Sequence, residues 1–210
     1  PQTTAELQTA VDMWVDDNAT ALSTYGEINT WDVSLITDMS ELFKSKTTFN
    51  DDISSWNVTN VTNMKNMFGG WDGTNFNQDI SSWDVSSVTN MEHMFQKAEY
   101  FNQNISSWDV SNVTNMETMF LGATSFNADI SSWDVSNVTN MKRMFEQANA
   151  FNQNISSWDV SNVTNMEYMF KGANNYNQEL LNWDVSSVTT MSNMFYGAES
   201  FNGDISSWDV

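Results

Sequence analysis

The sequence predicts an α/β repeat solenoid with one short parallel strand and one short helix in each 25-residue repeat. Three observations support this fold class. Tryptophans recur at a fixed spacing, each repeat joins an alternating segment to a segment with helical spacing, and the first 27 residues do not fit the repeat. A three-sided parallel β-helix is the alternative, and a chain with almost no helical signal would favour it.

The tryptophan spacing defines the repeat. The step is 25 residues throughout, except for a 27-residue step between Trp56 and Trp83. The series is Trp31, Trp56, Trp83, Trp108, Trp133, Trp158, Trp183 and Trp208. In arrays of this kind each unit buries its apolar face on its neighbours. We therefore expect residues 28–210 to form a single solenoid, with a two-residue insertion near residues 69–75 in a glycine-rich loop.

Residues 1–27 are predicted to form an N-terminal helical cap. Thr3 or Thr4 is the expected N-cap residue. Leu7, Val11 and Trp14 fall on one face of a helix. An atypical end unit of this kind closes the exposed core of a repeat array.

The other end of the sequence has no such unit. The chain reaches Val210 at the end of a strand motif. An uncovered solenoid end promotes aggregation. The sequence therefore predicts either a truncated array, with further repeats or domains beyond the C-terminus, or another element that covers this end.

Within one repeat, the strand is expected at Trp108-Asp109-Val110. The alternation predicts that Trp108 and Val110 point inward and that Asp109 points outward. Thr114 and Glu117 have the spacing of a capping box at a helix start. The apolar face of that helix would consist of Val113, Met116, Met119 and Phe120. Gly122 is expected to end the helix.

Composition limits the classes of partner. The net charge is −20, with 7 basic and 27 acidic residues. This balance argues against nucleic acids and anionic membrane surfaces, and it favours cations or basic partners. The chain has no cysteine, which excludes disulfides and thiolate metal sites. It also has no run of 18 apolar residues that could span a membrane.

One outward aspartate per repeat forms the candidate metal site. Neighbouring parallel strands lie about 4.8 Å apart. Two unit charges at about that distance repel by roughly 0.9 kcal/mol even in water. A calcium ladder would offset this repulsion, and so would a basic partner, raised pKa values or hydrogen bonds from serine hydroxyls and backbone amides. The candidate ligands are Asp84, Asp109, Asp134, Asp159, Asp184 and Asp209. Apart from calcium, no cofactor is predicted.

Four residues are candidates for partner contacts. Trp71 lies outside the regular repeat, so we expect an exposed aromatic side chain there. His93, Arg143 and Tyr168 occupy one position that varies freely between repeats, which predicts a solvent-facing site on the helix. The regular tryptophans, in contrast, are expected in the core.

The unit I-S-S-W-D-V-S-N-V-T-N-M-x-x-M-F-x-x-A-x-x-F-N resembles the repeat of about 25 residues in bacterial surface proteins of the DUF285 family, known from mycoplasma and Listeria lipoproteins. Related repeats occur in BspA-like surface proteins. The resemblance covers residues 28–210. It implies a leucine-rich-repeat-like coil in which Ile105, Trp108 and Val110 take the apolar strand positions. It also implies surface display and adhesion, without catalysis.

These observations favour a non-enzymatic module on a cell surface or in a secreted protein that binds a protein or a glycan. The sequence has no Ser-His-Asp set, metal-ligand cluster or phosphate loop that would indicate an enzyme. Two alternatives remain open. Regular Thr, Asn and Asp columns could match an ice or mineral lattice, or the chain could be a passive spacer in a larger surface protein.

Overall fold

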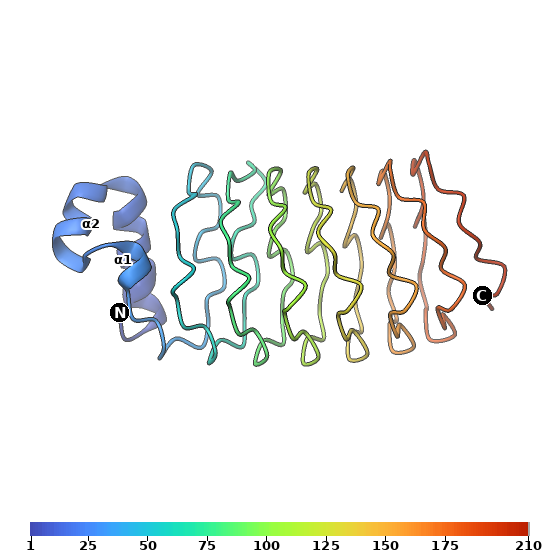
Figure 1. The fold of residues 1–210 in the computed structure, drawn as a ribbon, viewed down its shortest axis with the longest axis horizontal. Helices are drawn as coiled ribbons and strands as arrows, with labels where there is room; N and C mark the ends of the chain where they lie inside the picture. Colours follow the sequence, from blue (N-terminus) through green and yellow to red (C-terminus); the bar gives the residue numbers. More distant parts are fainter. Residues whose placement is uncertain (210) are drawn as a thin grey trace.

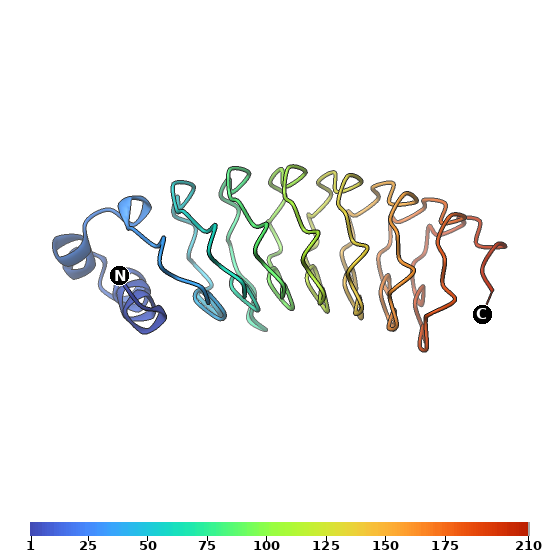
Figure 2. The ribbon, with the colours of Figure 1, turned by 90° about the horizontal axis from the view of Figure 1, so that it is seen from below.

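The computed structural model describes residues 1–209, and Val210, the last residue of the predicted array, lies outside them. The chain passes from two N-terminal helices into a row of similar coils stacked along the long axis of the molecule (Figure 1). A view turned by 90° shows the same row, with the termini at opposite ends (Figure 2). We call each repeating turn a coil and name it by its residues, for example coil 105–129.

The N-terminal helices are α1 (Thr4–Asp16) and α2 (Asn18–Tyr25). α1 begins where the sequence predicts, because the side chain of Thr3 accepts a hydrogen bond from the backbone N–H of Glu6 at 3.2 Å. Asp17 separates the helices and caps α2 by accepting a hydrogen bond from Thr20. The buried residues of α1 are Leu7, Ala10, Val11 and Trp14.

The predicted elements of the repeat are wrong. Within residues 1–209, helix beyond α1 and α2 is limited to the 3-10 turn η1 (Ile28–Thr30), and no strand is formed. Neither the coil with one strand and one helix nor the three-sided β-helix describes this structure. Neighbouring coils instead share isolated parallel bridges. These join Asp38 to Asn63, Asn63 to Asn90, Asn90 to Asn115, Asn115 to Asn140, Asn140 to Asn165 and Asn165 to Thr190.

Tight turns replace the predicted helix. Met119 N donates to Met116 O at 3.2 Å, and Ala123 N donates to Phe120 O at 3.0 Å. Each bond spans three residues, whereas an α-helix needs bonds across four. Apolar residues three or four positions apart therefore face the interior without forming a helix.

The backbone N–H groups of the residues that alternate with these turn donors bond instead to carbonyls of the next coil. The backbone N–H groups of Met116, Thr118, Phe120 and Gly122 donate to the carbonyls of Asn140, Lys142, Met144 and Glu146, at 2.7–3.0 Å. Thr118 and Gly122 have φ values of 55° and 68°. A left-handed residue reverses the local winding of the chain. These two residues thus keep the segment from coiling into a helix and leave alternate amides free to bond between coils.

The predicted capping box is also wrong. The Thr114 hydroxyl donates to the carbonyl of Thr89 in the preceding coil, at 3.3 Å. Asn115 Oδ1 accepts the backbone N–H of Glu117 at 3.0 Å, which makes a local turn. Asparagine thus directs the chain here, and Gly122 has no helix to end.

The predicted interior is correct. Trp108 and Val110 are buried, with 3% and 1% of their surface exposed. The indole N–H of Trp108 donates to Ile80 O in an earlier coil at 3.1 Å. This bond explains how a large ring with a polar N–H fits inside the stack.

Aromatic rings continue this interior from coil to coil. The rings of Phe120 and Phe126 stack with centroids 3.8 Å apart, and Phe126 stacks on Phe151 of the next coil at 5.9 Å. The asparagine column beside them is structural: Asn127 Oδ1 accepts the backbone N–H of Asn152 at 2.9 Å. Each coil thus repeats both its packing and its polar contacts.

Tyr176 is the exception in the aromatic column and supports a test of this packing. Its ring stacks on Phe151 at 5.8 Å, but its buried hydroxyl has no hydrogen-bond partner among the described residues. Burial also raises the pKa of this hydroxyl. An unsatisfied buried polar group costs about 1–3 kcal/mol. We therefore expect Tyr176→Phe to raise the free energy of unfolding by about 1 kcal/mol, measured by urea denaturation.

Phe151→Tyr is the matched control, because it places a hydroxyl in the same column one coil earlier. We expect that substitution to lower the free energy of unfolding by about 1 kcal/mol. Equal stability of the wild type and both variants would show that the column accommodates a hydroxyl without cost.

Candidate functional site

Three surface features of the stack are candidates for function. The first is the column of outward aspartates. The second is the side of each coil where residues vary, which we call the variable side; in coil 130–154 it consists of Lys142, Arg143 and Glu146. The third is a cavity between coils 155–179 and 180–204.

All six predicted metal-site aspartates are exposed on the stack: Asp84, Asp109, Asp134, Asp159, Asp184 and Asp209. Five of them make the same local contact with the serine two residues later. Asp159, for example, accepts the backbone N–H of Ser161 at 3.1 Å and its hydroxyl at 2.6 Å. These carboxylates are thus held by hydrogen bonds from the chain itself.

These hydrogen bonds outweigh the repulsion along the column. The hydroxyl and the backbone N–H of Ser161 lower the pKa of Asp159, although the negative charge of Asp184 acts in the opposite direction. Among residues 1–209, no three acidic or histidine side chains are grouped closely enough to hold a metal ion. The calcium ladder therefore stays a prediction, and the observed contacts supply the alternative means of holding the charge.

The basic residues all lie on or next to the variable side of the coils. They are Lys44, Lys46, Lys65, Lys97, Lys142, Arg143 and Lys171. Most are paired with acids: Lys65 bonds to Glu92 at 3.0 Å, and Lys142 to Glu167 at 2.8 Å, each across neighbouring coils. The aspartate column has no basic residue beside it in the repeat. The two surfaces therefore differ strongly in charge.

Arg143 and Tyr168, two of the predicted partner contacts, lie together. The Arg143 guanidinium is 4.6 Å from the centre of the Tyr168 ring, and Lys171 Nζ is 4.9 Å from it. Glu146 lies 3.0 Å from Lys171 and 3.2 Å from Arg143. We call these four residues the Tyr168 cluster. It combines an aromatic ring, two cations and one largely buried carboxylate on a mostly acidic protein.

The sequence predicted His93 on a solvent-facing helix. In the structure the residue lies in a half-buried segment that is not helical. Its φ is 59°, and its side chain is 24% exposed. Nε2 lies 3.1 Å from Glu92, and Nδ1 contacts the Thr118 hydroxyl. Burial lowers the pKa of His93, although Glu92 and Glu117 oppose this change. The position varies because several polar side chains fit the left-handed conformation.

Trp71 is exposed, as predicted, with 69% of its surface accessible. Lys97 Nζ lies 6.0 Å from the centre of its ring. The glycines before it allow the insertion to pack against the stack: a Cβ on Gly69 would lie 2.3 Å from the carbonyl oxygen of His93. Trp71 belongs to the 69–75 insertion, several repeats before residues 143–171 of the Tyr168 cluster, and successive repeats follow one another along the stack (Figure 1), so the predicted partner contacts do not form one site.

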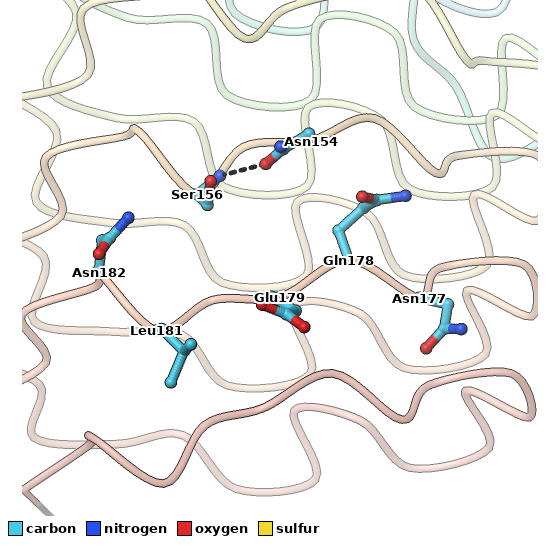
Figure 3. Close-up of a pocket in the computed structure, with 7 residues that line it drawn as sticks. All are labelled: Asn154, Ser156, Asn177, Gln178, Glu179, Leu181 and Asn182. Atoms are coloured by element: carbon cyan, nitrogen blue, oxygen red, sulfur yellow. Dashed lines mark hydrogen bonds between the residues drawn. The ribbon is translucent and has the colours of Figure 1, made fainter.

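The cavity has a volume of about 420 Å³. Figure 3 shows its lining residues projecting from two successive coils. They are Asn154, Ser156, Asn177, Gln178, Glu179, Leu181 and Asn182. The lining is mostly polar and includes one carboxylate, several amides and one exposed leucine.

This cavity lies where residues 179–182 depart from the repeat. In the neighbouring coils, Asn154 and Asp204 accept the backbone N–H two residues later, at 3.0 and 2.8 Å. Glu179 is one methylene longer and does not make this turn. Similarly, Ser157 Oγ donates to the preceding coil at 3.2 Å, whereas Asn182 makes no such bond. Each lost hydrogen bond costs about 1 kcal/mol of stability.

The sequence contained a signal for this cavity. Leu180-Leu181-Asn182 replaces the Ile-Ser-Ser that occurs at this position in most repeats, and Glu179 replaces Asp or Asn. The pattern predicted no site at Glu179 or Asn182, because polar residues before the expected strand are typical of turns.

His93 provides a pH-dependent test of the variable side. The folded protein binds a proton at His93 at a lower pH than the unfolded chain, whose pKa is near the ordinary value of 6.5. The unfolded state therefore binds more protons in this range, so stability is full above about pH 6.5 and falls as the pH decreases toward the folded-state pKa. Urea denaturation between pH 8 and pH 5 should show this decline.

His93→Asn should reduce the decline, because asparagine does not titrate and already occupies the equivalent left-handed positions at Asn66 and Asn193. A variant with the same pH dependence as the wild type would show that His93 is not the responsible group.

Comparisons with known proteins place the chain in a family. A family model described as "Mycoplasma protein of unknown function, DUF285" matches residues 11–133 and 124–210. No curated protein and no solved structure matches the chain. In the part of the chain that the structure describes, no helix is long and apolar enough to cross a membrane. The two matched segments together span most of the sequence, and the chain belongs to the DUF285 family.

Proposed function

We propose that this chain is a non-enzymatic module of a cell-surface or secreted protein that binds a protein or glycan partner. One observation carries the proposal: a constant frame displays variable side chains on one side. The interior and the turns repeat from coil to coil, whereas the equivalents of Lys142, Arg143 and Glu146 change in charge, size and shape. Stacked repeats with such surfaces provide extended binding faces.

The Tyr168 cluster is the best supported contact within this side. Aromatic and arginine side chains contribute most to binding at protein interfaces. Here Arg143 lies over the Tyr168 ring at 4.6 Å, so the two side chains already restrict each other before a partner binds. Restricting side chains in advance lowers the entropic cost of association.

The ice- or mineral-binding alternative has weaker support. It requires free hydroxyl groups in regular columns, but the threonine hydroxyls bond within the stack. Thr139 Oγ1, for example, donates to Thr114 O at 3.2 Å, and Thr164 Oγ1 donates to Thr139 O at 3.1 Å.

The passive-spacer alternative predicts no saturable ligand. The binding screen described next distinguishes it from a binding module.

A binding screen of the intact chain against arrays of glycans and purified extracellular-matrix proteins tests the proposal. We expect saturable binding to at least one member. The double variant Arg143→Asn/Tyr168→Asn should weaken binding of a macromolecular partner at least tenfold, because it removes both side chains of the cluster. Asparagine is suitable since Asn66 and Asn193 occupy the same column with φ values of 57° and 55°.

Asp134→Asn is the matched control, because Asn57 occupies that column in another coil and the position lies on the aspartate surface. Its affinity should equal that of the wild type. Absence of saturable binding to every array member would refute the binding function and favour a spacer.

A further inference from the structure

We propose that the cavity beside Glu179 binds a neutral saccharide. This inference rests on the proposed binding function but assigns a ligand class to a site whose lining includes no residue of the Tyr168 cluster. Its volume of about 420 Å³ falls within the range of small-molecule sites, which is about 300–1,000 Å³.

The cavity contains polar groups that the protein does not use internally. The Glu179 carboxylate and the Asn182 amide are exposed and make no hydrogen bond to residues 1–209, whereas the equivalent residues Asn154, Asp204 and Ser157 bond to the chain. Figure 3 shows both side chains on the stretch of residues 177–182, which lies beside the stretch that carries Asn154 and Ser156. These groups are therefore available to a ligand.

Other lining groups are fixed and partly available. Gln178 Nε2 donates to Asn152 O at 3.1 Å and to Asn152 Oδ1 at 3.0 Å, which orients the side chain and leaves its carbonyl oxygen free to accept. Asn177 Oδ1 accepts the backbone N–H of Asn202 at 2.7 Å, which leaves the Asn177 amide hydrogens to donate. The site thus offers oriented acceptors and donors side by side.

This combination suits a sugar. Each sugar hydroxyl both donates and accepts, so a carboxylate and several amides can satisfy it in both directions. Leu181, which is 37% exposed, provides an apolar surface at the same site for the C–H groups of a pyranose ring. A mostly polar lining with one apolar contact thus matches the surface of a sugar ring, which carries many hydroxyls and a few C–H groups.

Other ligand classes fit less well. The lining has no basic side chain, and the protein carries a net charge of −20, so anionic sugars and phosphates would be repelled. A purely apolar ligand would leave the carboxylate and amides unpaired. A lysine-containing peptide could pair with Glu179, but it would leave the surrounding amides unused, and it serves as a competing probe in the test.

The test uses a variant that restores the regular repeat. Glu179→Asp, Leu181→Ser and Asn182→Ser together introduce the residues found at the corresponding positions 129, 131 and 132. This triple variant should regain the missing turn and the hydroxyl contact, so its melting temperature should equal or exceed that of the wild type. It should also lack the unpaired groups that we assign to sugar binding.

The probes are lactose, maltose, cellobiose and chitobiose, with sialyllactose and a trilysine peptide as charged comparators, titrated by NMR and calorimetry. We expect at least one neutral disaccharide to bind the wild type saturably and the triple variant at least tenfold more weakly. Asp134→Asn on the aspartate surface is the control and should retain wild-type affinity for that disaccharide.

Three results would overturn the inference: no binding of any neutral probe, equal binding by the triple variant, or binding of trilysine or sialyllactose alone. The failures of the two proposals are distinguishable. A partner that depends on the Tyr168 cluster, without any bound disaccharide, would retain the proposed function and reject only the saccharide site.

Discussion

The backbone hydrogen bonds between successive coils are the constraint on which the rest of this structure depends. Phe120 N donates to Met144 O at 2.9 Å, and Gly122 N donates to Glu146 O at 2.7 Å, one coil further along. Buried backbone groups must be paired, and a coil of tight turns cannot pair all of them internally. Each coil therefore requires its neighbour, and the 25-residue spacing keeps the bonding groups in register.

This register also explains which surfaces are free for function. Inside the stack, aromatic rings lie on their equivalents in the next coil, as in the pair Phe120 and Phe145 with centroids 5.8 Å apart. On the outside, aspartates are held by local turns. The variable side tolerates changes because the recurring hydrogen bonds between coils are made there by backbone groups, which do not depend on the identity of the side chains. Binding residues can thus vary without loss of the frame. The cavity at Glu179 is a place where part of the polar frame is missing.

The sequence predicted which residues are buried better than it predicted the conformation of the backbone. Tryptophan spacing and alternation correctly identified Trp108 and Val110 as buried. The capping pattern predicted Thr3 or Thr4 as the N-cap of the first helix, and the structure has Thr3. The prediction of a short helix in each repeat was wrong, because apolar residues three and four positions apart also fit consecutive tight turns. The left-handed conformation at Thr118 has no clear sequence signal, although Gly122 and the asparagines of other coils occupy such positions.

The predictions of site residues were likewise correct where they depended on burial or exposure and wrong where they depended on backbone conformation. Exposure of Trp71 followed from its glycine-rich insertion, and Arg143 and Tyr168 lie together because they occupy one column in adjacent coils. His93, in the same column, is half-buried because its backbone segment is not a helix. The cavity at Glu179 arises from lost contacts between coils, which no single repeat reveals.

NMR of the labelled protein tests the central claim most directly. Nuclear Overhauser contacts should join the backbone of Thr118 to that of Lys142 in the next coil, because the Thr118 N–H bonds to the Lys142 carbonyl at 2.8 Å. Couplings at Thr118, Arg143 and Tyr168 should report positive φ angles. Helical carbon shifts from Thr114 to Gly122, with contacts only between residues three and four apart, would contradict the account.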